Sequence, residues 1–377
     1  MRNCAVRIKK NKIVDVFNED RFNNKNFSKN TYFIDAKGAN VVPGFIDTHI
    51  HGFGGYGTED ALVDSILKMS ELLLPYGITS FIPTLYSAPK KQMLLGIRAI
   101  ARAMGKEKGA RILGMHLEGP FISPERLGVQ SRESVMPVDL SLMEEFWAVS
   151  MGHIVNMTVA PELPHMRELA LYCLSKGIVL QAGHTNATYE QMVEGMQTRI
   201  MHVTHLFNAM SRMHHRDPGA VGAVFIHPEL SCEIIADGIH INPEIIKFLL
   251  TCKAADKVVL VTDALKTTKQ KKKPLIANGE EVYLDQCFYR QSDHAIAGSA
   301  LTMLDSVKNI ISYGFHMEQA VRMASTNPAH IMKQDHLGII APGYDADLIV
   351  LDQRLNVLYS IVQGKLFHRG KEVCASL

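Results

Sequence analysis

The alternation of short apolar runs with amphipathic stretches, from residue 44 to about residue 265, constrains the fold more than any other feature. The runs are rich in β-branched residues and mostly lack polar alternation, which is typical of parallel strands buried on both faces. Eight such units in about 220 residues predict a (β/α)8 barrel of the TIM type. A doubly wound sheet is the competing arrangement, but no GxGxxG motif follows the first run. The runs are Phe45–Asp47, Ile78–Thr84, Ile112–Leu117, Ile154–Ala160, Ile178–Gly183, Ile200–His205, Glu233–Asp237 and Val258–Asp263.

The stretches between the runs carry helix-end signals. Thr188 followed by Gln191 fits a capping box, and Asn242-Pro243 fits an N-cap with proline at the first helical position. Gly177 fits a helix stop. These signals support helices between the strands. Two further helices are expected around Leu301–Tyr313 and Met317–Ala324.

Both ends of the chain differ from the central region. Residues 1–42 and 341–377 contain short alternating segments, and neither end is large enough for a core of its own. We therefore expect one small β-sandwich domain built from both termini, beside a catalytic barrel over residues 43–340. The expected strands are Cys4–Ile8, Ile13–Phe17, Tyr32–Asp35, Asp347–Leu351, Val357–Val362 and Lys365–His368.

Composition excludes several classes of protein. Lys+Arg is 40 and Asp+Glu is 38, giving a formal net charge of +2, whereas binding through nucleic-acid phosphates usually needs a larger basic excess. The 47% hydrophobic share is too high for disorder. No apolar run is long enough for a membrane span, and no signal-peptide pattern is present. Six scattered cysteines without a CxxC pair predict free thiols. We expect a cytoplasmic protein without nucleic-acid or membrane partners.

Six of the eight expected strands end in His, Asp or Glu. A parallel barrel places its active residues at the carboxyl ends of its strands, so these side chains are expected on one rim. Ionisable residues are rarely buried without a partner, and one metal ion satisfies several of them together. The strand-end residues are His49, His51, Glu118, His184, His205, His240 and Asp263.

The spacing of these residues suits a metal centre. His49 and His51 are two apart on an extended strand and point to the same side. Glu118 offers a carboxylate that could bridge two ions, while His184 and His205 end neighbouring strands. A donor set without thiolates is typical of a catalytic site with an open water position. Asp263, at the end of the eighth strand, is well placed to take a proton from the attacking water and pass it to a leaving group.

Each residue alone also has a structural interpretation. A single His at a strand end is more often hydrogen-bonded than a ligand, and an Asp there often caps the next helix. All six strand ends coinciding on one rim by chance is far less probable, so the sequence favours a metal-dependent hydrolase.

Motifs along nearly the whole chain resemble a known family. Pro43–Gly52 (PGFIDTHIHG) resembles the first-strand metal motif of the amidohydrolase superfamily, and Pro342–Val350 (PGYDADLIV) is similar to its return into the small β domain. Within that superfamily the chain resembles the N-acetylglucosamine-6-phosphate deacetylase family. The segments that carry this resemblance are His116–Ile122 (HLEGPFI), Gly183–Asn186 (GHTN), Thr204–Met210 (THLFNAM), His214–Gly222 (HHRDPGAVG), Ala236–His240 (ADGIH), Leu260–Ala264 (LVTDA) and Ala297–Ser299 (AGS).

The resemblance implies hydrolysis of a linear amide: the acetyl group is removed from N-acetylglucosamine 6-phosphate, giving glucosamine 6-phosphate and acetate in amino-sugar metabolism. It implies that Glu118, His184 and His205 bind a divalent metal, with zinc the first expectation and iron or another ion the alternative. Asp263 is the implied catalytic acid/base, and His240 contacts the substrate and polarises the acetamide carbonyl. Because the chain also keeps the HxH pair, His49 and His51, one or two ions per subunit remain open.

The resemblance also implies a set of substrate contacts. Asn208, the Ala209 backbone and Arg216 are expected at the sugar phosphate, and a guanidinium suits a phosphate dianion. Arg216 is expected to reach the pocket of a neighbouring subunit, which implies a homodimer. The remaining expected contacts are Val129, Gln130 (where the family often has His), Ile296, Ala297 and Gly298.

Two rival functions are kept. The first is another amidohydrolase, acting on an N-acyl or cyclic amide. The pair Asn208 and Arg216 would distinguish this chain from such an enzyme, since a substrate without phosphate has no need for this pair. The carbamylated-lysine type is disfavoured because Val159–Glu162, at the end of the fourth strand, contains no lysine. The second rival is a non-catalytic barrel, against which the intact set of metal-binding residues argues.

Overall fold

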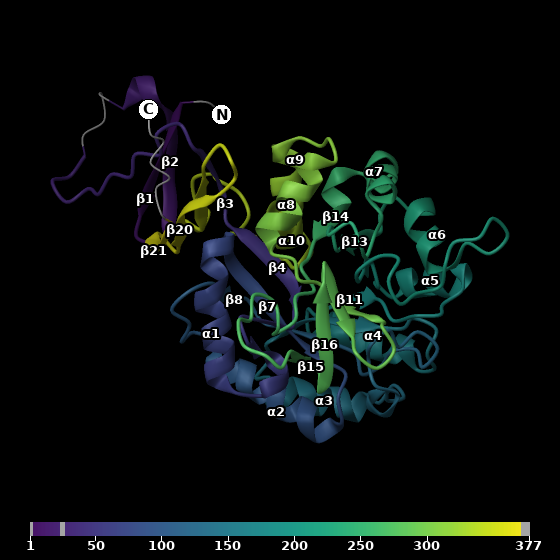
Figure 1. Ribbon diagram of the computed structural model, residues 1–377. Helices are drawn as coiled ribbons and strands as arrows, with labels where there is room; N and C mark the ends of the chain where they lie inside the picture. The colour runs from purple at the N-terminus through teal and green to yellow at the C-terminus, as the bar shows by residue number, and fades with distance from the viewer. Residues whose placement is uncertain (1–2, 23–26, 371–377) are drawn as a thin grey trace.

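A barrel of eight parallel strands forms the centre of the computed structural model, which describes residues 3–22 and 27–370 (Figure 1). The strand order is β14-β13-β12-β11-β10-β9-β7-β4, so each strand lies beside the next one along the chain. The predicted fold class is therefore confirmed. The barrel strands are β4 (Phe45–Ile50), β7 (Ile78–Tyr86), β9 (Met115–Glu118), β10 (Ile154–Val159), β11 (Val179–Ala182), β12 (His202–Val203), β13 (Ser231–Ile234) and β14 (Val258–Leu260).

The barrel closes at a seam between β4 and the end of β14. The Asp263 amide donates to the His49 carbonyl at 2.9 Å, and the His51 amide donates to the Ala264 carbonyl at 2.9 Å. The buried Asp47 carboxylate accepts a 2.6 Å hydrogen bond from the Thr262 hydroxyl. These bonds bring the ends of the first and last strands together, so their functional side chains share one rim.

Helices lie on the outside of the barrel (Figure 1), and their ends agree with the sequence signals. Thr188 and Gln191 form the reciprocal bonds of a capping box, and Asn242 Oδ1 accepts from the Glu244 amide at 2.9 Å. The helices are α1 (Val63–Leu73), α2 (Lys90–Ala103), α3 (Leu140–Val149), α4 (Met166–Ser175), α5 (Tyr189–Gln197), α6 (Gly219–Ile226), α7 (Pro243–Cys252), α8 (Met303–Ser312), α9 (Met317–Ala324) and α10 (Thr326–Ile331).

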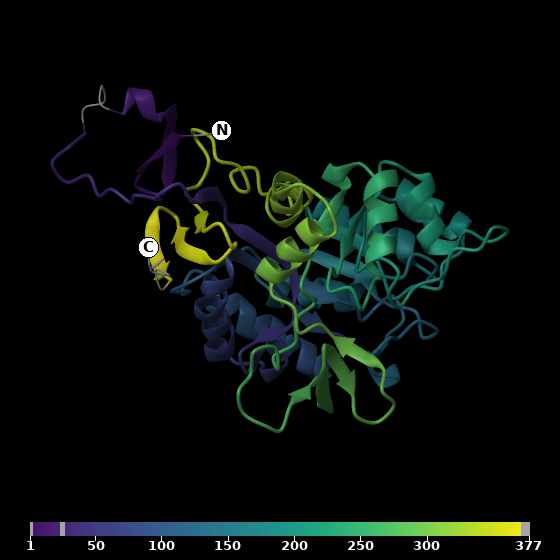
Figure 2. The ribbon, with the colours of Figure 1, turned by 45° about the horizontal axis from the view of Figure 1, so that its top comes forward.

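Strands from both termini lie side by side at one flank of the barrel, in purple and yellow (Figures 1 and 2). One sheet pairs β1 with β2, the other has the order β21-β20-β19-β3, and Ile13, Leu348 and Ile361 share their core. The predicted strand at Tyr32–Asp35 is wrong, because this segment pairs with no strand and Tyr32 is exposed. The exact domain boundaries stay a prediction. The strands are β1 (Cys4–Lys9), β2 (Lys12–Asn18), β3 (Asn40–Pro43), β19 (Leu348–Leu351), β20 (Val357–Val362) and β21 (Lys365–Arg369).

A further antiparallel sheet, which the sequence did not reveal, is formed by the segment between β14 and α8 and projects from the barrel (Figure 2). Its inner side packs against Tyr86 and Leu265 through Val282 and Phe288. This packing places Ile296–Gly298 at the rim of the barrel, where β18 lies. The sheet contains β15 (Ile276–Ala277), β16 (Glu280–Asp285), β17 (Cys287–Arg290) and β18 (Ile296–Gly298). The remaining short strands are β5 (Gly52–Phe53), β6 (Tyr56–Gly57) and β8 (Arg111–Ile112).

The cysteines agree with the expectation of free thiols as far as the structure describes them. Cys4, Cys173, Cys232, Cys252 and Cys287 form no disulfide, while Cys374 lies outside the described residues. Within residues 3–22 and 27–370, no helix combines the length and the apolar character that crossing a membrane requires.

Candidate active site

The predicted site residues lie at the carboxyl ends of the barrel strands. His51 follows β4 directly, and Glu118 is the last residue of β9. His184, His205 and Asp263 come shortly after β11, β12 and β14. The barrel topology therefore brings residues up to 212 positions apart in the sequence to one rim.

The backbone turns sharply where three of these side chains leave their strands. His184, His205 and Asp263 have φ values of 47°, 30° and 48°. Such left-handed conformations cost non-glycine residues about 1–3 kcal/mol each and persist only where the surroundings enforce them. Here the carbonyl of each turned residue accepts a backbone hydrogen bond, from Ser123, Asn208 and Ser299 respectively. The strained backbone conformations therefore occur at the three residues whose side chains point into the cavity.

One cavity of about 540 Å³, including the part open to solvent, contains nearly all the predicted residues. Of the predicted residues, only His49 and Arg216 are not part of its lining. His49 is fully buried but its ring still reaches the cluster described below, whereas Arg216 is exposed. The lining is His51, Tyr86, Glu118, Gly128, Val129, Gln130, His184, His205, Asn208, Ala209, His240, Asp263, Ile296, Ala297 and Gly298.

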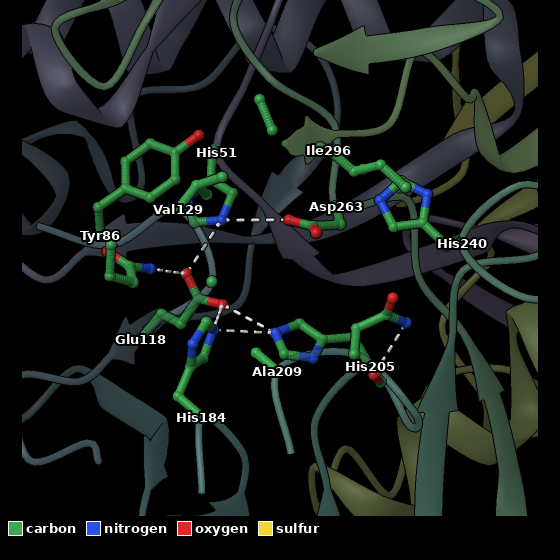
Figure 3. Close-up of a pocket in the computed structure, with 15 residues that line it drawn as sticks. His51, Tyr86, Glu118, Val129, His184, His205, Ala209, His240, Asp263 and Ile296 are labelled. Atoms are coloured by element: carbon green, nitrogen blue, oxygen red, sulfur yellow. Dashed lines mark hydrogen bonds and ion pairs between the residues drawn. The ribbon is translucent and has the colours of Figure 1, made fainter. Parts of the chain in front are cut away.

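Glu118 lies between two groups of histidines (Figure 3). Its Oε1 is 3.1 Å from Nε2 of both His184 and His205, and 3.4 Å from Nε2 of His49. Its Oε2 is 3.4 Å from Nε2 of His51. The ligand atoms form two buried triads, His49–His51–Glu118 and Glu118–His184–His205, each with its atoms within 4.8 Å of one another. Both triads have the donors and spacing of a divalent-metal site, with one carboxylate common to both.

The hydrogen bonds made by Nδ1 of the histidines show whether the other ring nitrogen, Nε2, is free to bind a cation. Nδ1 of His51 meets the Thr84 carbonyl, Nδ1 of His184 meets the Arg126 carbonyl, and Nδ1 of His49 meets Glu233 Oε2, at 3.1–3.2 Å. These oxygens can only accept, so each Nδ1 donates, and a neutral ring then presents a lone pair at Nε2. Lone pairs facing carboxylate oxygens repel unless a cation or a proton lies between them. The residues present therefore fit a divalent metal.

The carboxylates and histidine rings of the cluster shift one another's pKa values. Burial opposes ionisation of Glu118, but the rings of His49, His184 and His205 outweigh it and hold the pKa of Glu118 well below its usual range. Burial likewise opposes ionisation of Asp263, but the His51 hydrogen bond and the charge of His49 lower the pKa of Asp263. Both groups are consequently carboxylates at neutral pH, and their charge attracts a cation.

His240 stands across the cavity from Glu118 (Figure 3), and it is paired with Asp237. His240 Nδ1 is 2.6 Å from Asp237 Oδ2, and Asp237 Oδ1 accepts from the amides of Ile239 and His240. Burial opposes the charge of Asp237, but His240 outweighs it and lowers the pKa of Asp237. The carboxylate fixes Nδ1 as a donor and orients the ring, so Nε2 is the nitrogen available to a ligand.

The predicted substrate contacts differ in how freely they reach a ligand. Gln130 is almost fully buried, and its Nε2 donates to Glu118 Oε2 at 2.6 Å. Its Oε1 has no partner among the described residues. Asn208 Nδ2 donates to the carbonyls of His205 and Leu206, both at 3.2 Å. Gln130 and Asn208 thus keep their amide oxygens as the atoms still able to accept a hydrogen bond.

Arg216 lies outside the cavity of its own chain. It belongs to the exposed loop after Met210, where its Nη1 is 2.9 Å from His215 Nε2. The own-chain cavity therefore does not include the predicted guanidinium partner for a phosphate.

Sequence reasoning missed several residues of the site, among them Tyr86 and Glu233. Tyr86, at the end of β7, stacks on His51 with ring centroids 3.6 Å apart and an interplanar angle of 3°. Glu233 is fully buried in β13 and contacts His49. The position of Tyr86 at a strand end and the charge of Glu233 at the start of an apolar run were the available signals.

Comparison with known proteins connects this geometry to a family. A family model described as "Amidohydrolase family" matches residues 40–367. The N-acetylglucosamine-6-phosphate deacetylase of Lysinibacillus sphaericus is 31% identical over 335 residues, which cover 88% of this chain and 87% of that protein.

Solved structures extend the similarity to the fold. The crystal structure of N-acetylglucosamine-6-phosphate deacetylase from Pasteurella multocida is 30% identical, with a TM-score of 0.90 over 98% of this chain and 96% of that one. The Mycobacterium smegmatis enzyme, solved as an aspartate-to-alanine mutant in complex with N-acetyl-D-glucosamine-6-phosphate, is 27% identical. Its TM-score is 0.88, over 96% of this chain and 94% of that one.

Proposed function

The chain belongs to the amidohydrolase family, and we propose that it hydrolyses N-acetylglucosamine 6-phosphate to glucosamine 6-phosphate and acetate. The observation that carries this function is the cavity in which the Glu118–His184–His205 triad faces Asp263 and His240. The similarity of the chain to relatives named N-acetylglucosamine-6-phosphate deacetylase, over most of their length, supports the substrate.

The two triads are the proposed metal positions. Glu118, His184 and His205 would hold the essential cation, and His49 and His51 would hold a second one together with Glu118. Imidazole and carboxylate donors suit zinc and also accept iron(II), and zinc is our first assignment. When bound, a divalent cation lowers the pKa of water and stabilises negative charge on the acetamide oxygen.

Asp263 is the proposed general base and acid. Its Oδ1 lies 3.2 Å from His51 Nε2, while 15% of its side chain remains open to the cavity. As a carboxylate it takes a proton from the attacking water, and it then gives this proton to the departing amine. Asp237 holds Nδ1 of His240, so the ring can donate from Nε2 to the acetamide oxygen only in its doubly protonated imidazolium form, in which it stabilises the charge that develops there.

The proposed sugar-phosphate contacts come from two subunits. Asn208 and Ala209 line the cavity, together with Val129, Gln130 and Ile296–Gly298. The exposure of Arg216 and its absence from the own-chain cavity support its role in the cavity of a second copy, in a homodimer. A cytoplasmic location completes the proposal.

The test measures acetate release by the zinc-loaded protein. We expect turnover of N-acetylglucosamine 6-phosphate, with kcat/KM at least about 100-fold above that of unphosphorylated N-acetylglucosamine, because charge-assisted hydrogen bonds to the phosphate are lost. N-acetylgalactosamine 6-phosphate, the C4 epimer, measures the selectivity for the sugar. Equal rates with and without phosphate would exclude the phosphate assignment. Turnover only of N-acyl amino acids or cyclic amides would favour the first rival, and no turnover of any substrate would favour the non-catalytic one.

A further inference from the structure

Glu233 is a fully buried carboxylate that the proposed reaction does not use. It belongs to β13 and does not line the cavity. Its Oε1 accepts hydrogen bonds from Thr48 Oγ1 at 3.2 Å and Gln181 Nε2 at 3.1 Å, and its Oε2 is 3.2 Å from His49 Nδ1. In the described part of the chain, its ion-pair partners are the rings of His49 and His202, without a lysine or arginine.

The contact with Glu233 determines which nitrogen of His49 faces the cluster. Because a carboxylate oxygen accepts, His49 Nδ1 must carry the proton, and Nε2 is left as the lone-pair nitrogen of the neutral ring. This Nε2 is buried and has no hydrogen-bond partner among the described residues. It lies 3.4 Å from Glu118 Oε1 and 3.6 Å from Asp263 Oδ1, two atoms that cannot donate to it.

The charges around His49 also favour a cation at Nε2. Glu118, Asp263 and Glu233 place three carboxylates around the ring of His49. Burying carboxylates without compensating positive charge is strongly unfavourable. A cation at Nε2 would balance the charges on both sides of the ring, and a carboxylate behind a ligating histidine makes that histidine a stronger ligand.

We propose that Glu233 is a positioning residue for the second cation, which it favours by fixing the proton of His49 on Nδ1 and by placing a negative charge behind the ring. The inference rests on the proposed metal-dependent function. It predicts that this protein binds a second metal ion at His49, His51 and Glu118. It also predicts that the affinity of this site for the ion depends on Glu233, which is not one of the ligands.

In the experiment, a chelator first removes metal from the full-length protein, which is then titrated with zinc. Calorimetry and competition with a chromogenic chelator measure the binding. Wild type should bind two equivalents. Glu233→Gln keeps the size of the side chain but removes its charge, so the Kd of the second equivalent should rise about 10- to 100-fold. The first equivalent, at Glu118, His184 and His205, should change less than about threefold, because Glu233 contacts none of these residues.

A matched control separates positioning from general disturbance of the barrel interior. Thr48→Val removes one hydrogen bond to the same carboxylate but leaves its charge and its His49 contact, so both equivalents should bind as in wild type. If Glu233→Gln does not fold, Glu233→Asp keeps the charge but shortens the reach to His49, and it should also weaken only the second equivalent.

Three results would overturn the proposal. The first is a wild-type protein that binds only one zinc, in which case a proton balances His49. The second is a pair of Glu233 variants that retain the second equivalent unchanged. The third is an equal loss of both equivalents, which would make the role of Glu233 structural. None of these depends on substrate, so acetate release from N-acetylglucosamine 6-phosphate tests the proposed function separately.

Discussion

Glu118 and Asp263 are carboxylates in one cavity, but their surroundings suit them to different tasks. Both oxygens of Glu118 are engaged, Oε1 by histidine rings and Oε2 by His51 and Gln130. Among the described residues, Asp263 is held by ion pairs through Oδ1, and it keeps part of its side chain open. A fully engaged carboxylate suits metal binding, whereas a partly open one suits proton transfer.

This difference predicts the behaviour of Asp263→Asn. Asparagine keeps the shape and leaves both metal triads intact, so zinc content should match wild type. Because the amide cannot accept and return a proton, kcat should fall about 1,000-fold. Metal analysis and steady-state kinetics on the same preparation measure both quantities. A variant that keeps more than a tenth of the wild-type kcat would remove Asp263 from its proposed role.

At the scale of elements, the sequence predicted the strands and helices that bury apolar surface. Each of the eight apolar runs overlaps a barrel strand, because a strand covered on both faces is mostly apolar. The β15–β18 sheet was not predicted because its strands are short and only partly buried, so burial leaves little pattern in them. Tyr32–Asp35 has an alternating pattern but no pairing partner.

Predicting the site depended on the same topology. Strand ends converge in any closed parallel barrel, so the cavity residues could be predicted once the barrel was recognised. The contact between His49 and Glu233 spans 184 positions and depends on side-chain orientation inside the barrel. Periodicity does not encode such a contact, and only the charge at the start of an apolar run indicated it.

The seam between β4 and β14 should make stability depend on pH. Burial, only partly offset by hydrogen bonds from Thr262, raises the pKa of Asp47 to about 7, against 3.8 when unperturbed. An acid with a raised folded pKa contributes stability below its unfolded pKa, and this contribution is lost as pH rises through about 7. Asp47→Asn cannot ionise and its amide can still bond Thr262. Its stability advantage over wild type should therefore grow between pH 5 and pH 8, by about 2–3 kcal/mol.

Urea unfolding of the metal-free protein at pH 5 and pH 8 measures this effect. The quantity of interest is the difference in unfolding free energy between Asp47→Asn and wild type at each pH. A difference that is the same at both pH values would show that Asp47 does not titrate in this interval.

At the scale of the whole molecule, one arginine connects the barrel to the terminal sheets. Arg111 Nη1, on β8, donates to Asp345 at 2.8 Å and to Asp347 at 2.9 Å. Asp347 is nearly buried, and its burial outweighs Arg111 and raises the pKa of Asp347. Arg111→Met would leave this carboxylate without its cation and should lower the unfolding free energy by about 2–3 kcal/mol.

Lys12 provides the control for this prediction. It pairs with the same Asp345 at 2.8 Å but is more exposed, so Lys12→Met should cost less than about 1 kcal/mol. Chemical denaturation of both variants gives the comparison. Equal losses would indicate that the Arg111 contact does not join the two parts of the molecule more strongly than a surface pair.

The proposed shared site predicts that two inactive variants regain activity when their subunits combine in a mixed dimer. If Arg216 serves the neighbouring cavity, a dimer of one Asp263→Asn subunit and one Arg216→Ala subunit has one site with both defects. Its other site has an intact Asp263 and receives an intact Arg216. Two variants that are each nearly inactive should therefore recover about a quarter of wild-type activity when subunits exchange at random. Mixing them under mild denaturation, then measuring kcat/KM and mass in solution, tests this. If Arg216 acted within its own chain, each site of the mixed dimer would keep one defect and no activity would return.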